Sequence, residues 1–229
     1  MAVDELLLER AIRSAHPDPI VRIYGWAVPT LSIGRHQRLS DEVVVRCRNR
    51  GVEVARRPTG GTAVLHQEDV TYSVVAPHSS RGVLEAYRWV ARGLIASLAR
   101  LGLEAVVSEH ARSSRISAAC FAATVGADLE VGGSKVCGSA QVRRRGWFLQ
   151  HGSIPVSPTW PATEELLDHR GPSACTCLQD LRPATTTSEV QTCLAKGFSE
   201  VWGEHTTITC TYEALSVVPF GGDYACLTF

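Results

Sequence analysis

The stretch GGSKVCGSAQ (residues 132–141) decides how the middle of the chain folds. Its two adjacent glycines signal a turn between two segments of alternating side chains, at 127–131 and 135–143. After Arg144-Arg145-Gly146 a further strand is predicted at 147–154, and it returns beside the second segment. The pattern therefore predicts a meander of strands around this stretch.

The strand predicted after the double glycine has two different faces, because successive side chains of a strand point to opposite sides. One face is polar and is expected to point at a cavity or at solvent: Lys135, Cys137, Ser139 and Gln141. The other face is small and apolar and is expected to pack on the core: Val136, Gly138, Ala140 and Val142.

The rest of the chain mixes strands with long helices. Strands are predicted at 20–26, 52–56, 71–75 and 206–209, and a short strand or turn at 29–34. Helices are predicted at 3–14, 41–50, 80–101 and 188–202, with a loop and a short helix between 155 and 172. Meanders mixed with helices indicate the α+β class: a mixed, largely antiparallel sheet with helices packed against it. Since no linker or repeat is visible, we expect one domain over residues 1–229.

Composition limits the functions that the chain can have. Lys+Arg and Asp+Glu both number 23, so no overall field attracts nucleic acid or an anionic membrane. Arg143–Arg145 could still be either a solvated turn or a docking patch. No apolar run reaches a membrane-spanning length, and the acidic start is not a secretory signal. We therefore expect a cytoplasmic protein whose eight cysteines are reduced, and Cys175 and Cys177 are too close for the usual zinc spacing.

Cys120 and Lys135 are the candidates for nucleophilic chemistry. A thiol accepts an acyl group only as the thiolate, and a nearby ammonium favours that charged form. Together in a pocket, the two could take an acyl group as a thioester and pass it on. Cys137, two residues from Lys135, competes with Cys120 for this role, and its alternative role is that of a small buried residue.

Two further motifs carry candidate binding residues. In RRPTGGTAVLH (residues 56–66), Gly60 and Gly61 let the backbone approach a ligand, and exposed N–H groups could hold an oxygen. Arg56 or Arg57 could add a charged donor, although the glycines alone favour a hairpin turn with flanking surface arginines. LQHGSI (149–154) contains His151, which, like His66, is open to a purely structural role.

In this order and spacing, the three motifs resemble the biotin/lipoate protein ligase superfamily. The matching segments are 56–66, 133–141 and 150–154, and residues 1–5, 24–26 and 29–30 also fit. The resemblance covers residues 1 to 155 well and the remainder weakly, and it implies an α+β catalytic domain. Thr62 departs from the third glycine that ligases often have there. Because Met1 starts almost on the first helix, the native start is left open and could lie upstream.

Cys120-Phe121 resembles the cysteine-dependent octanoyltransferase branch of that superfamily, which uses this cysteine with the motif lysine. The resemblance implies an ATP-independent acyltransferase with Cys120 and Lys135 as catalytic residues. It would move octanoyl from acyl carrier protein, through a cysteine thioester, to the target lysine of a lipoyl domain. The acceptor would be the glycine cleavage H protein or a dehydrogenase acyltransferase subunit. The substrate-binding residues would be Arg57, Gly60, Gly61, Thr62, His66, Gly138, Ser139, Ala140 and His151.

No cofactor or metal is implied, and a monomer is the default expectation. Three alternatives remain at this point: an octanoyl amidotransferase between lipoyl domains, an ATP-dependent lipoate-protein ligase, and a non-catalytic binder of carrier proteins. The sequence leaves the acyl donor, the chain length and the roles of Cys137, His66 and His151 open.

Overall fold

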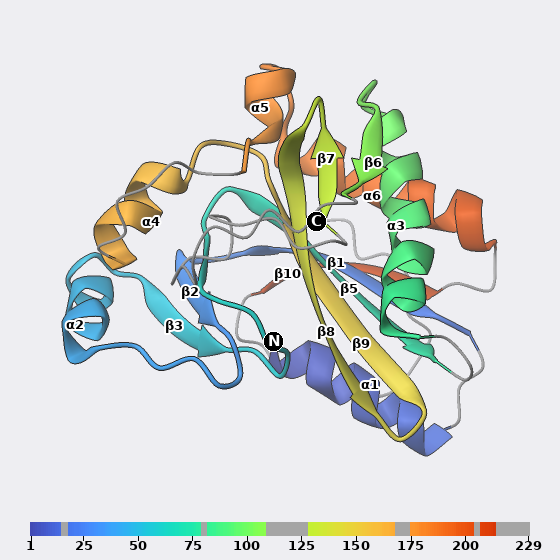
Figure 1. The fold of residues 1–229 in the computed structure, drawn as a ribbon, viewed down its shortest axis with the longest axis horizontal. Coiled ribbons are helices and arrows are strands. Elements are labelled where there is room, and N and C mark those ends of the chain that lie inside the picture. The colour runs from blue at the N-terminus through green and yellow to red at the C-terminus, as the bar shows by residue number, and fades with distance from the viewer. Residues whose placement is uncertain (15–17, 79–81, 109–127, 168–174, 204–206, 214–229) are drawn as a thin grey trace.

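A computed structural model describes residues 1–14, 18–78, 82–108, 128–167, 175–203 and 207–213. Its largest element is a seven-stranded sheet in the order β10-β1-β5-β9-β8-β7-β6 (Figure 1). All neighbours in this sheet run antiparallel except β10 and β1, which are parallel. The strands are β1 (Ile20–Trp26), β5 (Asp69–Pro77), β6 (Ala105–Val107), β7 (Leu129–Val131), β8 (Ser134–Arg144), β9 (Trp147–Pro155) and β10 (Thr207–Glu213).

Helices cover both faces of this sheet (Figure 1). On one face, α3 (Val83–Ala99) and α6 (Thr187–Trp202) enclose the main core together with buried residues of β1, β5, β8 and β9. On the other face lies α1 (Ala2–Ser14), whose Leu8 and Ala11 pack against Val75 and Leu149. Two apolar layers on opposite faces hold the central strands between them, so those strands are buried along nearly their whole length.

A second, smaller sheet lies beside the first. Its order is β3-β2-β4, formed by β3 (Glu53–Arg56), β2 (Thr30–Ile33) and β4 (Val64–His66). It packs with α2 (Asp41–Asn49) and α4 (Trp160–Leu167) around buried Leu31, Leu65 and Leu166. Ser40 caps α2 by accepting a hydrogen bond from the Val43 amide, which explains why this helix begins at Asp41. One further short helix, α5 (Leu178–Leu181), follows β9 and α4.

The predicted α+β class and the largely antiparallel sheet are confirmed. The strands β4 and β6 and the helix α5 were not expected, because each is only three or four residues long and shows no periodicity. The region 155–172 contains α4, in agreement with the predicted short helix.

The expected use of the two faces of β8 was wrong for Cys137, Gly138 and Ala140. As expected, Val136 and Val142 pack in core clusters and Ser139 lines a cavity. Cys137 lies in the core beneath α3 and α6, and Ser139 hydrogen-bonds Tyr72 of that same core. Gly138 and Ala140 instead line a cavity on the opposite face of the sheet, where Val142 packs with the α1 cluster. Gly138 and Ala140 can line a cavity because their small side chains leave space. The Ser139 hydroxyl is stable next to the core because it is hydrogen-bonded.

The alternation also fails at Val136. A register irregularity pairs Leu129 with Cys137 and Glu130 with Lys135, so Val136 lies opposite no residue of β7. Such a bulge changes the direction of the side chains next to it, and Val136 and Cys137 both enter the main core.

Within the described residues, no helix combines the length and apolar character needed to cross a membrane.

Candidate functional site

A narrow cavity lies where the small sheet meets the large one. The predicted substrate-binding residues that line it are Arg57, His66, Gly138, Ser139, Ala140 and His151. Its volume is about 30 Å³, roughly the share of one water molecule in the liquid.

The double-glycine turn fixes the position of Arg57. Arg57 is 5% exposed, and its guanidinium donates to the carbonyl oxygens of Gly60 (3.1 Å) and Thr62 (2.8 Å). Gly61 has φ 88°, and its carbonyl oxygen lies where a side chain at Gly34 would be, so both positions require glycine. Gly60, Gly61 and Thr62 thus shape the loop that fixes Arg57, and their contact with substrate stays a prediction.

A chain of hydrogen bonds runs along the cavity wall from Arg57 to Asp69. Arg57 donates to Ser32 Oγ (2.8 Å), and Ser32 Oγ lies 2.7 Å from His66 Nε2. His66 Nδ1 lies 2.7 Å from Asp69 Oδ2. The indole ring of Trp26 stacks on the His66 imidazole, with the ring centres 4.2 Å apart. Both His66 and Asp69 are buried, so this arrangement holds the imidazole in one orientation.

Sequence reasoning missed Ser32 and Asp69. A weak signal for each was present: Asp69 follows His66 by only three residues, and Ser32 is a polar residue between Leu31 and Ile33.

His151 belongs to a second buried network, centred on Asp4 of α1. Thr59 Oγ1 lies 2.6 Å from His151 Nε2, and His151 Nδ1 lies 3.8 Å from Asp4 Oδ2. Asp4 also accepts hydrogen bonds from Arg22, Tyr24 and Ser73. Burial lowers the pKa of His151 below its ordinary value, in spite of the nearby Asp4 carboxylate. His151 is therefore a neutral imidazole at pH 7, hydrogen-bonded to Thr59.

Lys135 is buried rather than solvated. Its side chain is 1% exposed, and its Nζ lies 2.8 Å from Asp128 Oδ2, just before β7. A desolvated ammonium held by a carboxylate differs from the solvated lysine that usually follows a turn, so Lys135 has a fixed position. Cys120, its predicted partner, lies outside the described residues.

Cys137 is fully buried and is not part of a disulfide, in agreement with its alternative role as a small core residue. The arginines after it are partly engaged within the protein. Arg144 forms ion pairs with Glu5 and Glu9 of α1, and Arg143 donates to the Gly82 carbonyl. These contacts give Arg143 and Arg144 a structural role, and docking of a partner by this cluster stays a prediction.

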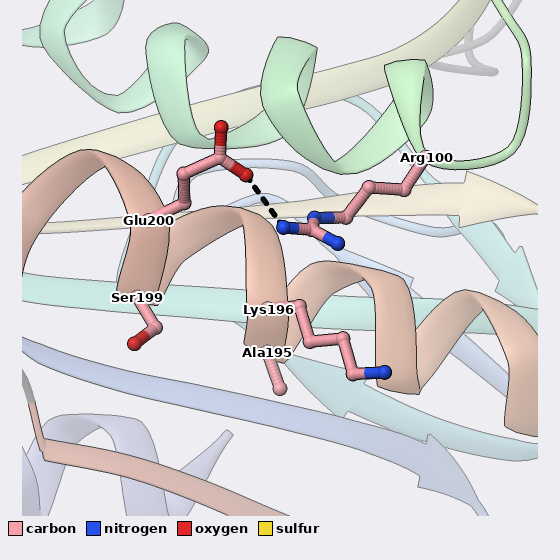
Figure 2. A pocket seen from close by; sticks show the side chains of 5 residues that line it. All are labelled: Arg100, Ala195, Lys196, Ser199 and Glu200. Carbon is pink, nitrogen blue, oxygen red and sulfur yellow. Dashed lines mark hydrogen bonds and ion pairs between the residues drawn. The ribbon is translucent and has the colours of Figure 1, made fainter.

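A second hollow, of about 440 Å³, lies on the outer surface between α3 and α6. Figure 2 shows Arg100 and Glu200 pointing toward one another across it, and their side chains form an ion pair of 2.7 Å. Lys196, Ser199 and Ala195 complete its lining. This open hollow contains no predicted site residue, and exposed ion pairs of this kind contribute little to stability.

Comparison with known proteins settles the family. Residues 1–199 match the lipoyl protein ligase A/B catalytic domain. The chain belongs to that family. Membership confirms the resemblance drawn from the three motifs, since residues 56–66, 133–141 and 150–154 all fall within the matched region.

Two relatives are similar to this chain over most of its length. Octanoyltransferase LipM of Kyrpidia tusciae is 40% identical over 89% of this chain and 82% of its own length. Octanoyltransferase LipM of Carboxydothermus hydrogenoformans is 47% identical over 68% of this chain, which spans 60% of that relative's length.

Solved structures of the lipoyl ligase group confirm the fold. Lipoate-protein ligase A bound with ATP superposes with a TM-score of 0.71 at 27% identity, covering 90% of this chain and 82% of that one. Protein Ta0514 of T. acidophilum with bound lipoic acid superposes with a TM-score of 0.70 at 25% identity, covering 93% and 85%.

Proposed function

We propose that this protein is an octanoyltransferase of protein lipoylation. It would take an octanoyl group from acyl carrier protein onto Cys120 and pass it to the target lysine of a lipoyl domain. The observation that carries the proposal is the 40% identity to an octanoyltransferase over 89% of the chain. The family also contains ATP-dependent ligases. A ligase would tolerate the loss of Cys120, so dependence on this cysteine distinguishes the two activities.

The first half of the reaction exchanges one thioester for another. The Cys120 thiolate attacks the donor carbonyl, and the phosphopantetheine thiolate leaves, so this half needs neither ATP nor the removal of a proton. Lys135 would favour the thiolate form of Cys120 through its charge. The buried pair with Asp128 supports this role, because it holds the ammonium in one place.

The second half forms an amide from a thioester. The target lysine of the lipoyl domain attacks the octanoyl carbonyl, and Cys120 leaves as the thiol. Backbone N–H groups near Lys135 could stabilise the developing oxyanion, an effect worth about 3 kcal/mol per donor in other enzymes. Gly138 and Ala140 line the cavity, so small side chains are present where an apolar chain would need room. The glycine cleavage H protein is the acceptor that we propose to test first.

Intact mass spectrometry tests the proposal. After incubation with octanoyl-acyl carrier protein and no nucleotide, the protein should gain one octanoyl group that hydroxylamine removes. Cys120→Ala should abolish the adduct, and Cys137→Ala is the matched control that should keep it. The reverse pattern would assign the nucleophile to Cys137.

Donor and nucleotide assays separate the related activities. Transfer from an octanoylated lipoyl domain, but not from acyl carrier protein, would make the protein an amidotransferase. Transfer of free octanoate that requires ATP and survives in Cys120→Ala would make it a ligase. A complex with carrier protein but without any adduct would leave only a binding role.

A further inference from the structure

The hydrogen bonds along the cavity wall have a definite direction. A guanidinium only donates, so Ser32 Oγ accepts from Arg57. A carboxylate only accepts, so the Nδ1 proton of His66 points to Asp69. The remaining nitrogen of a neutral His66, Nε2, then accepts the Ser32 hydroxyl proton at 2.7 Å, since the other acceptor near this hydroxyl, the Val64 carbonyl oxygen, lies farther away at 3.5 Å. The order of donation is Arg57 to Ser32 to His66 to Asp69.

This order leaves Ser32 with one free acceptor position. A hydroxyl oxygen has two lone pairs and one proton. Arg57 occupies one lone pair, and the proton is given to His66. Because Ser32 lines the cavity, its second lone pair can accept a hydrogen bond from a group that enters there.

Asp69 and Trp26 hold the His66 imidazole in place. Asp69 Oδ2 is fixed by Thr71 (3.1 Å) and Ser153, so the carboxylate stays beside Nδ1. The stacked Trp26 ring adds a favourable contact for a cation. Among the described residues, the charged and titratable groups that face this part of the cavity are Asp69 on β5, Arg57 after β3, His151 on β9 and the N-terminal ammonium of Met1.

We propose that Ser32, His66 and Asp69 form a proton relay that deprotonates the acceptor lysine in the amide-forming half of the reaction. The relay rests on the proposed function, since it needs an incoming lysine and an acyl thioester. Ser32 contacts the ammonium, His66 receives the proton through it, and Asp69 is a positioning residue for His66.

The proton balance shows why only the second half needs this relay. The lysine ammonium gives one proton to Ser32, and the Ser32 hydroxyl proton passes to His66 Nε2. The free amine then forms the C–N bond to the thioester carbonyl. As the C–S bond breaks, its electron pair goes to sulfur, which takes the second proton from nitrogen and leaves as the thiol. His66 later returns its proton to solvent, and the Cys120 thiol also gives its proton to solvent, so that the next cycle starts from the thiolate.

At neutral pH the acceptor lysine needs a base to remove its proton. A lysine of ordinary pKa, about 10.4, is neutral in roughly one molecule in 2,500 at pH 7. Arg57 assists, because its positive charge beside Ser32 disfavours the ammonium form of a bound amine.

The test separates the two halves of the reaction in His66→Gln. Octanoyl-enzyme is formed from octanoyl-acyl carrier protein, isolated by desalting and mixed with the apo H protein of glycine cleavage, with both steps followed by rapid quench and intact mass. We expect transfer to lysine at pH 7 to slow about 100-fold, as for loss of a general base, while acylation stays within threefold of the wild-type rate. His36→Gln, an exposed histidine elsewhere, is the matched control and should leave both steps unchanged.

The pH dependence of the second step gives an independent readout. Without the relay, the lysine must lose its proton to solvent, so the His66→Gln rate should rise about tenfold per pH unit from pH 7 to 9. The wild-type rate should rise much less over this range. A variant that lost only local structure would keep the shape of the wild-type profile.

Each other outcome contradicts the relay. Equal slowing of both halves would make His66 part of the oxyanion site, since both halves pass through a tetrahedral intermediate. No slowing of either half would give it a structural role only. Failure of the wild-type protein to form the octanoyl adduct would instead overturn the proposed function. If His66→Gln does not fold, Ser32→Ala decides, because it removes the proton-carrying hydroxyl without changing a buried charge.

Discussion

At the scale of single residues, the buried ion pair of Lys135 and Asp128 is the contact with the clearest cost of removal. Asp128→Asn would leave the Lys135 ammonium in a buried site without its carboxylate. Breaking such a pair from one side costs about 3–5 kcal/mol, so the free energy of unfolding should fall by about that amount. Urea unfolding measures it. Glu130→Gln, two residues on and only half-buried, should change stability by less than about 0.5 kcal/mol. A loss below about 1 kcal/mol in Asp128→Asn would show that the Lys135 ammonium does not depend on this carboxylate.

Single residues also show how much of the candidate site could be predicted from the sequence. Arg57, His66 and His151 stand out because their motifs are contiguous, and the structure places all of them at one cavity. Their partners were not predictable, since Ser32 precedes His66 by 34 residues and reaches it only through the pairing of β2 with β4. Lys135 was identified as a residue, but its burial depends on Asp128 across a turn and on the bulge in β8.

At the scale of elements, hydrophobic periodicity predicted the helices and long strands well, but not which face of β8 meets the core. Alternation fixes only that two sets of side chains point in opposite directions. The choice of face depends on what lies above and below the sheet. Here Ser139 hydrogen-bonds Tyr72 of the main core, whereas Gly138 and Ala140 line the cavity where the small sheet meets the large one.

The contact between α3 and α6 is tight enough to test. A methyl group at Gly197 would lie 2.5 Å from the backbone nitrogen of Ser97 and 2.7 Å from its Cα. Gly197→Ala should gain up to about 1 kcal/mol of helix propensity but lose more by overpacking, about 1–3 kcal/mol. We expect a net decrease in melting temperature. Ser199→Ala, exposed on the same helix, is the control and should be neutral or slightly stabilising. A more stable Gly197→Ala protein would show that the helices can move apart freely.

At the scale of the whole molecule, a buried polar network joins α1 to the large sheet and supports the cavity. Asp4 is fully buried, and Arg22, Tyr24 and Ser73 each donate to its carboxylate from β1 and β5. Arg22 in turn lies over the Tyr24 ring, 3.7 Å from its centre. The network reaches His151 and Thr59 at the cavity wall, so the docking of the first helix and the shape of the candidate site depend on one carboxylate.

This dependence predicts a specific loss of stability in acid. Burial raises the pKa of Asp4, but His151 and Arg22 beside it more than offset this and hold the pKa well below its ordinary value. A carboxyl whose pKa is lower in the folded than in the unfolded state contributes its full stability above the unfolded pKa, about 3.9. Below that pH the unfolded chain binds the proton first, so folding loses about 1.4 kcal/mol per pH unit from this group.

Urea unfolding between pH 5 and 2.5 should show this slope in the wild type. In Asp4→Asn the slope should be shallower by that amount, with stability at pH 7 lower by about 3–5 kcal/mol because the buried Arg22 guanidinium loses its carboxylate partner. Asp41→Asn, at the exposed start of α2, should keep the wild-type acid slope. Identical slopes in Asp4→Asn and wild type would mean that another carboxylate controls the acid transition.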